Sequence, residues 1–333
     1  MAKPLSRGLI NGKFKAMRIE HPGIKSLVAA CDGARDGARE FPFEDKSYID
    51  LFAPSHTGKS TAIKYYVENH VVPELISEGL FDADMPVREI AMKQTRVIHV
   101  TLTEKATRKS MYADILRRLG DERAHKGDIE DLRLRVYDYL ADKRVELLIL
   151  DEIQHLSQGV VRKIQDQKVK QLQTQGTEVT DALKNMMIHG LVPMLLAGIP
   201  EARVHLSVDE QFTNRNLEML DFSPLQWSNE DHQTTFEEFC GELGVLIFSE
   251  GLMAEPSDFL SGGIPHMMWA ACGGRLGLAS RIAEEAVFHA AARGVDRVHL
   301  EDLAMAVDTR AIPNKYCLYN PFRMGVIEMS VAE

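Results

Sequence analysis

The stretch APSHTGKST, residues 53–61, decides the fold, because it lies where an apolar run stops and a helical pattern begins. KSYIDLF precedes it with the character of a strand, and TAIKYYVENH continues from it with apolar residues at helical spacing. A turn needs no lysine, whereas a loop between a strand and a helix that contains Gly-Lys-Ser has the pattern G-x-x-x-x-G-K-[ST] of a phosphate-binding loop. The sequence therefore predicts such a loop, with Ala53 in place of the first glycine.

Each residue of this loop has an expected part in binding a nucleotide. Backbone N–H groups of a phosphate-binding loop wrap the phosphates, aided by the N-terminus of the following helix. We expect Lys59 to reach the β- and γ-phosphates, Ser60 to place its hydroxyl on Mg²⁺ and Thr61 to lie near the α-phosphate. The alternative is a glycine turn with a chance lysine. The predicted nucleotide-binding residues of the loop are Ala53, Pro54, Ser55, His56, Thr57, Gly58, Lys59, Ser60 and Thr61.

A second motif supplies the acids that a nucleotide–magnesium site needs. In KRVELLILDEIQHL, residues 143–156, Leu147–Leu150 form a continuous apolar run that suits a buried parallel strand. Asp151 and Glu152 follow where that strand should end, and ligands bind at this end in open α/β sheets. We expect Asp151 to hold the Mg²⁺ shell and Glu152 to orient and deprotonate the attacking water. A kinase must keep water out, so the second acid favours ATP hydrolysis; the alternative is an acidic strand cap.

Strands and helices alternate along the first two thirds of the chain. Further strands are predicted at 95–103 and 191–200, with helical patterns between them. This alternation predicts an α/β fold with a parallel sheet in a three-layer sandwich. From about Trp227 the pattern becomes helical, and Ser228 and Asp231 have the spacing of a capping box. The predicted organisation is an N-terminal arm at 1–45, a nucleotide-binding core at 46–227, a small helical domain at 228–311 and a C-terminal tail at 312–333.

Composition and charge limit the class of protein. The 333 residues are 45% hydrophobic and 26% charged, which is ordinary for a globular protein with a substantial core. The N-terminus lacks the apolar segment of a signal peptide, no apolar run approaches the roughly 20 residues of a membrane span, and the four cysteines form no C-x-x-C pair. We therefore expect a cytoplasmic protein without a membrane partner. Since the net charge is −10, binding to nucleic acid would require a local positive patch.

The order of these motifs resembles one family. HPGIKSLVAA, APSHTGKST, LLILDEIQHL, VPMLLAGIP and GGRLGLASRIAEEA before HLEDL are similar to the TniB/TnsC group of AAA+ ATPases, which help a transposase choose and engage target DNA. The resemblance implies a P-loop AAA+ core followed by a helical lid, with ATP and Mg²⁺ as cofactors. It also implies a homo-oligomer that assembles on double-stranded DNA as a ring or helical filament, with a transposase and a target-selection protein as partners.

In such oligomers ATP lies at the subunit junctions, which implies that an arginine of one subunit reaches the γ-phosphate of the next. QFTNRNLEML lies where this arginine falls, so the resemblance implies Arg215, with Arg203 as the alternative. The alternative for either is an ordinary surface arginine. The residues expected to carry hydrolysis are therefore Lys59, Glu152 and Arg215.

Two further expectations of the AAA+ pattern are altered here. Arg275 and Arg281 compete for the role of the lid arginine that senses the nucleotide, because Gly277 holds the usual position of that arginine. The polar sensor expected after the fourth strand is missing, since Gly198 and Ile199 stand there. Sensing of the γ-phosphate is therefore expected to be reduced or rerouted.

Two basic stretches are candidates for DNA contact. TEKATRKS follows a predicted strand, and VVRKIQDQKVKQ follows the acidic motif. In a ring, both could face a central channel and hold DNA phosphates without reading sequence. The alternative for each is a solvated helix face. The predicted DNA-binding residues are Lys105, Arg108, Lys109, Arg162 and Lys163.

The sequence leaves two other functions open. One is a helicase loader or origin-recognition-like initiator, which would share the AAA+ site. The other belongs to a different class, a nucleotide-gated signalling or defence module that binds protein and not DNA. ATP-dependent binding to random duplex DNA separates the last of these from the others.

Overall fold

The computed structural model describes residues 5–104, 106–155, 172–189, 191–207 and 209–327. The chain forms two compact units. The sheet unit comprises Gly23–Ser55 and Lys59–Phe222, and the helical unit comprises Met1–Pro22, His56–Gly58 and Ser223–Glu333. The first 45 residues, expected as one arm, are thus divided between the units. None of the described helices has the length and apolar character needed to cross a bilayer.

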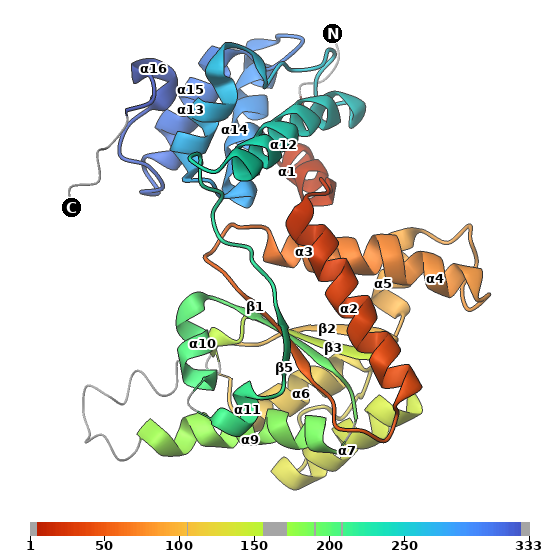
Figure 1. The fold of residues 1–333 in the computed structure, drawn as a ribbon. Helices are drawn as coiled ribbons and strands as arrows, with labels where there is room; N and C mark the ends of the chain where they lie inside the picture. The colour runs from red at the N-terminus through yellow and green to blue at the C-terminus, as the bar shows by residue number, and fades with distance from the viewer. Residues whose placement is uncertain (1–4, 105, 156–171, 190, 208, 328–333) are drawn as a thin grey trace. The chain divides into compact units, whose positions relative to one another are not determined.

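The sheet unit is built on five strands that pair in parallel in the order β2-β3-β4-β1-β5. This confirms the predicted α/β fold with a parallel sheet (Figure 1). Four strands lie where the sequence predicts them, whereas β5 stands in a segment for which no strand is predicted. The strands are β1 (Tyr48–Phe52), β2 (Val97–Thr101), β3 (Leu147–Asp151), β4 (Met194–Gly198) and β5 (Asn216–Met219).

Alternate residues of the strands bury two separate hydrophobic layers, one on each face of the sheet. On one face, Leu148 and Leu150 of β3 pack with helices α6, α7 and α9. On the other face, Leu147 and Ile149 pack with α2 and α3. Because all five residues of β3 are buried, this strand reads as the continuous apolar run expected of a central parallel strand. The helices of the sheet unit are α2 (Pro22–Glu40), α3 (Lys59–Tyr66), α4 (Val72–Ser77), α5 (Val87–Lys93), α6 (Arg108–Arg118), α7 (Ile129–Asp142), α9 (Leu172–Ile188), α10 (Pro200–Leu206) and α11 (Glu210–Thr213), with a π-helical turn at Val67–Val71.

The helical unit has one core, to which the N-terminal helix contributes Ile10 and Phe14. Its longest helix begins one residue later than the sequence predicts. Asn229, not Ser228, is the N-cap, because its side-chain oxygen accepts from the backbone N–H groups of Asp231 and His232. The helices of this unit are α1 (Arg7–Ala16), α12 (Glu230–Ser249), α13 (Ile264–Cys272), α14 (Leu276–Arg293), α15 (Leu300–Ala306) and α16 (Pro321–Met324), with a 3₁₀ turn at Ser261–Gly263 and a π-helical turn at Val307–Ala311.

A buried arginine ties α2 to the rest of the sheet unit. The side chain of Arg35 is 3% exposed, and its guanidinium donates to Glu74 at 2.5 Å, to Glu146 at 2.7 Å and to the hydroxyl of Tyr66 at 3.1 Å. That hydroxyl in turn donates to Asp32 at 2.7 Å. A buried charge is tolerated when its hydrogen bonds are complete, so this network fixes the position of α2 on the sheet.

We expect Arg35→Met to lower the free energy of unfolding of the sheet unit by about 3 kcal/mol, because the Tyr66 hydroxyl and two part-buried carboxylates lose their most buried donor. Urea unfolding followed by circular dichroism measures this. Arg39→Met is the matched control, since Arg39 also pairs with Glu74 and Glu146 but its side chain is 40% exposed. We expect the control to cost at most about 1 kcal/mol. Equal losses in the two variants would show that burial of Arg35 is not what matters.

Candidate nucleotide site

The predicted phosphate-binding loop connects β1 to α3. It begins with Ala53, whose backbone N–H donates to the carbonyl oxygen of Gly198 at 3.1 Å, and α3 begins at Lys59. Gly58 has a φ of +99°, and His56 has a φ of +66°. These left-handed conformations turn the chain sharply ahead of the helix N-terminus, and at Gly58 a side chain would be strained. The loop therefore has the strand–turn–helix geometry that phosphate binding requires.

The ammonium of Lys59 lies within this loop. It donates to the carbonyl oxygens of Ala53 at 2.5 Å and Pro54 at 2.9 Å. Burial lowers the pKa of Lys59 below its ordinary value, although the charges of Asp151 and Glu152 act to raise it. Phosphate oxygens are stronger acceptors for an ammonium than neutral carbonyls, so a triphosphate would draw Lys59 from the loop backbone to the β- and γ-phosphates.

Ser60 and Asp151 are brought together at the carboxyl end of β3. The Ser60 hydroxyl donates to Oδ2 of Asp151 at 2.9 Å, and Oδ1 accepts from the backbone N–H of Glu152 at 2.9 Å. His99 of β2 lies behind the carboxylate, with its Nε2 at 3.4 Å from Oδ2. Burial raises the pKa of Asp151, but His99, Ser60 and the Glu152 backbone together hold it below its ordinary value. Asp151 is therefore a fixed anion at neutral pH.

This donor set fits Mg²⁺. A hydroxyl and a carboxylate are the hard oxygen ligands that Mg²⁺ prefers, and this ion takes few protein ligands because it keeps water and substrate phosphates in its shell. The described part of the chain holds no cluster of three or more His, Cys, Asp or Glu side chains that would suit a metal caged by protein alone. Ser60 and Asp151 therefore stay the predicted Mg²⁺ residues.

Glu152 has an unusual backbone and a close partner. Its φ is +64°, a left-handed conformation that a non-glycine residue rarely adopts. Its carboxylate accepts from the side-chain amide of Gln154, and Nε2 of His155 is 3.8 Å from the same oxygen. Such strain is held in place by surrounding contacts and is common at catalytic sites. The sequence predicted the role of Glu152 but gave no role to Gln154 or His99.

The two arginines considered for the γ-phosphate of a neighbouring subunit lie in different places. Arg215 is in the turn between α11 and β5, where its guanidinium pairs with Asp45 at 2.9 Å. Arg203 is on α10 and pairs with the buried Asp50 of β1 at 2.8 Å. The carboxylate of Asp50 is 3% exposed, whereas that of Asp45 is 56% exposed. The ion pair of Arg215 is therefore the weaker one, and breaking it costs less free energy.

The lid arginines lie in the helical unit. Arg275 is the N-cap residue of α14 and donates to the carbonyl oxygen of Cys272 at 3.1 Å, while Arg281 pairs with Glu284 at 2.8 Å. Gly277 stands against the loop residue His56 of the same unit, where a Cβ would lie 2.7 Å from the backbone oxygen. A side chain at 277 would therefore clash with the loop backbone, so an arginine does not fit at this position. The sensing role stays a prediction for both arginines.

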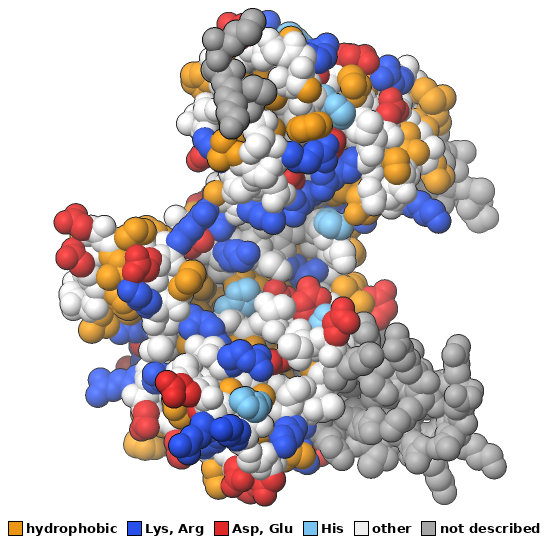
Figure 2. Space-filling model, turned by 180° about the vertical axis from the view of Figure 1, so that it is seen from behind, with side chains coloured by type: hydrophobic (Ala, Val, Ile, Leu, Met, Phe, Trp, Pro, Cys, Tyr) orange, Lys and Arg blue, Asp and Glu red, His pale blue; other side chains and the backbone are white. Residues whose placement is uncertain are grey.

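The predicted DNA contacts are only partly placed. Lys105, Arg162 and Lys163 lie outside the described residues. Arg108 and Lys109 occupy the first turn of α6, which Thr107 caps. On the face drawn in Figure 2, basic and acidic side chains are interspersed, so the net charge of −10 does not produce one uniformly acidic surface. A local basic patch is therefore compatible with the acidic composition.

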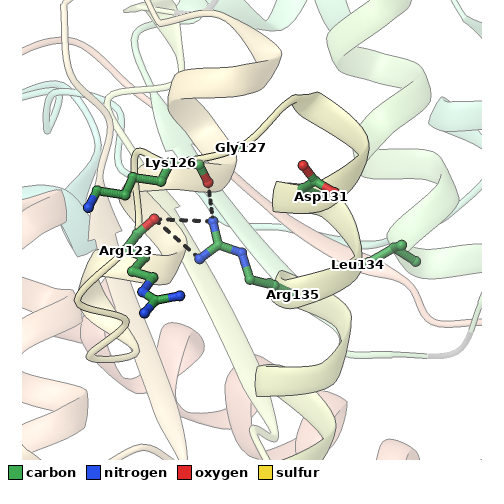
Figure 3. A pocket seen from close by; sticks show the side chains of 6 residues that line it. All are labelled: Arg123, Lys126, Gly127, Asp131, Leu134 and Arg135. Atoms are coloured by element: carbon green, nitrogen blue, oxygen red, sulfur yellow. Dashed lines mark hydrogen bonds between the residues drawn. The ribbon is translucent and has the colours of Figure 1, made fainter.

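An open hollow of about 590 Å³ lies beside α7. Figure 3 shows the side chains that line it, among them Arg135, whose guanidinium donates to the carbonyl oxygens of Arg123 and Lys126. Asp131 and the half-exposed Leu134 line the same hollow. These bonds fix the turn between α6 and α7, so we assign the hollow a structural role.

The chain is similar to known proteins in the sequence of one domain and in its fold. Residues 44–206 match the AAA domain family. Similar solved structures include the Aeropyrum pernix ORC2 protein in ADPNP-ADP complexes, with 14% identity over 89% of this chain and 71% of that chain and a TM-score of 0.56. The ORC1 protein of the same organism in complex with DNA has 16% identity over 91% and 69%, with a TM-score of 0.57. Cdc6p of Pyrobaculum aerophilum has 14% identity over 92% and 71%, with a TM-score of 0.53. No curated protein sequence matches this chain significantly.

These findings confirm the P-loop AAA+ fold. Because residues 44–206 match an AAA domain, they also confirm that the chain is an ATPase. At identities of 14–16% the solved structures speak for the fold alone. The narrower resemblance to the TniB/TnsC group stays a prediction.

Proposed function

We propose that this AAA+ ATPase assembles on double-stranded DNA in its ATP-bound state and regulates DNA transposition by recruiting or activating a transposase. The observation that carries the proposal is the grouping of Lys59, Ser60, Asp151 and Glu152 at one edge of the parallel sheet. ATP held there would join neighbouring subunits, and hydrolysis would release them. The order of motifs from HPGIKSLVAA to HLEDL supports transposition as the process.

The geometry supports a hydrolytic step in which each group has one task. Ser60 and Asp151 would hold Mg²⁺, which neutralises charge on the β- and γ-phosphate oxygens. Lys59 adds a second positive charge to the same oxygens. Glu152 accepts a proton from water while the water oxygen bonds to the γ-phosphorus and the bond to the bridging oxygen breaks, so that ADP and phosphate leave. Asp151, with its lowered pKa, stays ionised throughout.

We expect Arg215→Ala to keep nucleotide binding but to lower ATP hydrolysis about 10³-fold, because an arginine supplied in trans is worth about 10³ to 10⁵ in rate. Steady-state phosphate release measures this. Lys59→Ala subunits still carry Arg215, so mixing the two inactive variants should restore part of the activity if the arginine acts across subunits. Arg203→Ala is the control. Loss of activity in Arg203→Ala with normal activity in Arg215→Ala would show that Arg203, and not Arg215, acts on the neighbouring subunit.

A DNA-binding experiment tests the proposed function. Filter binding with random duplex DNA, with and without a slowly hydrolysed ATP analogue, should show binding that depends on nucleotide and falls steeply with salt. Lys109→Ala should weaken binding equally for all sequences and reduce the salt slope by about one. Gel shift of the same samples reports the size of the assembly. No binding at low salt would refute the proposal and favour a module that binds protein.

The second candidate is a replication initiator or helicase loader. It is favoured by the fold similarity to the ORC1 protein of Aeropyrum pernix, which was solved in complex with DNA. The two functions differ in what they require of the DNA. An initiator would prefer a particular origin sequence, whereas a target-selection ATPase would bind random duplexes equally well. Competition between random duplex and candidate origin DNA therefore separates them.

A further inference from the structure

The carboxyl end of β4 carries no polar side chain, because Gly198 and Ile199 stand where a polar sensor is expected. A polar group nevertheless reaches this place from the neighbouring strand. The side-chain oxygen of Gln154, which follows β3, accepts a hydrogen bond from the backbone N–H of Ile199 at 3.3 Å. The Gln154 amide, which follows β3, thus supplies a polar group at the end of β4.

The other end of the same amide holds Glu152. Nε2 of Gln154 donates to Oε2 of the Glu152 carboxylate. The two contacts agree on the orientation of the amide, because the N–H of Ile199 requires an acceptor and the carboxylate requires a donor. Gln154 therefore links the end of β4 to the carboxylate that follows β3. Since one carboxylate oxygen is engaged, the orientation of the other is restricted.

Gly198 makes room for this link. A Cβ at position 198 would lie 2.9 Å from the side-chain oxygen of Gln154 and 3.1 Å from the ring of Phe52. The strand conformation of Gly198 is open to any residue, since it lies within regular β4. A side chain at 198 would therefore require the Gln154 amide and the ring to shift, whereas the backbone would accept it. The glycine at 198 thus leaves the space that the side chain of Gln154 occupies.

We propose that Gln154 is a positioning residue for ATP hydrolysis, which orients Glu152 toward the attacking water and replaces the polar side chain that β4 lacks. The inference rests on the hydrolytic part of the proposed function. The side chain of Glu152 is 41% exposed, so packing alone does not fix its orientation and the hydrogen bond from Gln154 restricts it. A carboxylate that turns freely spends less time within hydrogen-bond reach of the water, and the rate of proton transfer falls.

The first test is Gln154→Ala, with kcat and nucleotide affinity measured separately. We expect kcat for ATP hydrolysis to fall about 10- to 100-fold, as for loss of a hydrogen bond to a charged group, while the Kd for ATP stays within about twofold. Gln233→Ala is the matched control, because it breaks a glutamine–glutamate bond of 2.9 Å to Glu237 in the helical unit. An unchanged or raised kcat in Gln154→Ala would overturn the proposal.

The second test begins with a variant that keeps Gln154 and Glu152 in place. Gly198→Ala puts a Cβ against the Gln154 amide, so kcat should fall several-fold with the Kd for ATP unchanged. In the Gln154→Ala background, Gly198→Asn returns an amide to the end of β4 and should recover a large part of the lost kcat. A purely structural role for Gln154 would give lower thermal stability and no recovery by Gly198→Asn.

These rates are measured first without DNA. A wild-type protein that hydrolyses ATP but binds no duplex would refute the DNA-binding proposal and leave the test of Gln154 intact. A wild-type protein that binds DNA with ATP, together with a Gln154→Ala variant of normal kcat, would refute the inference alone. The two failures are therefore distinguishable.

Discussion

Lys59→Ala is expected to abolish nucleotide binding and, with it, every ATP-dependent property of the chain. Lys59 is the one cation that the loop itself contributes, and its ammonium already lies against the loop carbonyls of Ala53 and Pro54. Loss of charge-assisted hydrogen bonds to two phosphates removes about 3 kcal/mol or more, so the Kd for ATP should rise at least about 100-fold. Isothermal titration calorimetry measures this.

Lys64→Ala is the control for this variant, because Lys64 is an exposed lysine of the same helix. Its ATP affinity should match that of the wild type. If Lys59→Ala binds ATP normally, the nucleotide does not use this loop.

The lowered pKa of Lys59 predicts a pH dependence of ATP binding. The ammonium loses its proton at a lower pH than an ordinary lysine does, so ATP affinity should fall as the pH rises toward the ordinary lysine pKa of 10.5.

Glu152→Gln should separate binding from chemistry. Glutamine keeps the shape of the side chain but cannot accept a proton from water, so hydrolysis should fall about 10²- to 10⁴-fold while ATP binding is retained. Because hydrolysis is proposed to release subunits from DNA, the variant should accumulate as a long-lived assembly. Phosphate release and light scattering in the presence of duplex DNA measure the two effects on the same sample.

Glu201→Gln provides the control for this change, since Glu201 is an exposed acid at the start of α10. It should hydrolyse ATP at the wild-type rate. A Glu152→Gln protein with normal turnover would show that another group activates water. A variant that loses hydrolysis but also loses ATP binding would instead show that Glu152 supports the loop.

The sequence predicts the parts of this fold whose signals are local. β3 is recognisable because Leu147–Leu150 form a continuous apolar run, and the phosphate-binding loop is recognisable because Gly58 and Lys59 stand between a strand and a helix. β5 is different, since it has only four residues and three of them are exposed, although NLEM alternates polar and apolar residues. It forms a strand because β1 offers a free edge, which no local pattern reveals.

The residues of the site also divide into those with a local sequence signal and those without one. Lys59, Ser60, Asp151 and Glu152 follow from two short motifs, whereas Gln154 gains its role from Ile199, which lies 45 positions further along the chain. The sequence does carry an indirect signal, the glycine where a polar residue is expected. Only the structure shows that the glycine and the glutamine depend on each other.

The place of β1 inside the sheet has a consequence for slow motions. β1 is paired on both sides, by β4 and β5, and β3 is likewise flanked by β2 and β4, whereas β2 and β5 each have one neighbour. Backbone amides of flanked strands exchange with solvent deuterium only through rare, large openings. The two strands that deliver Lys59 and Asp151 are thus, with β4, the last to open, and the edge strands β2 and β5 fluctuate first.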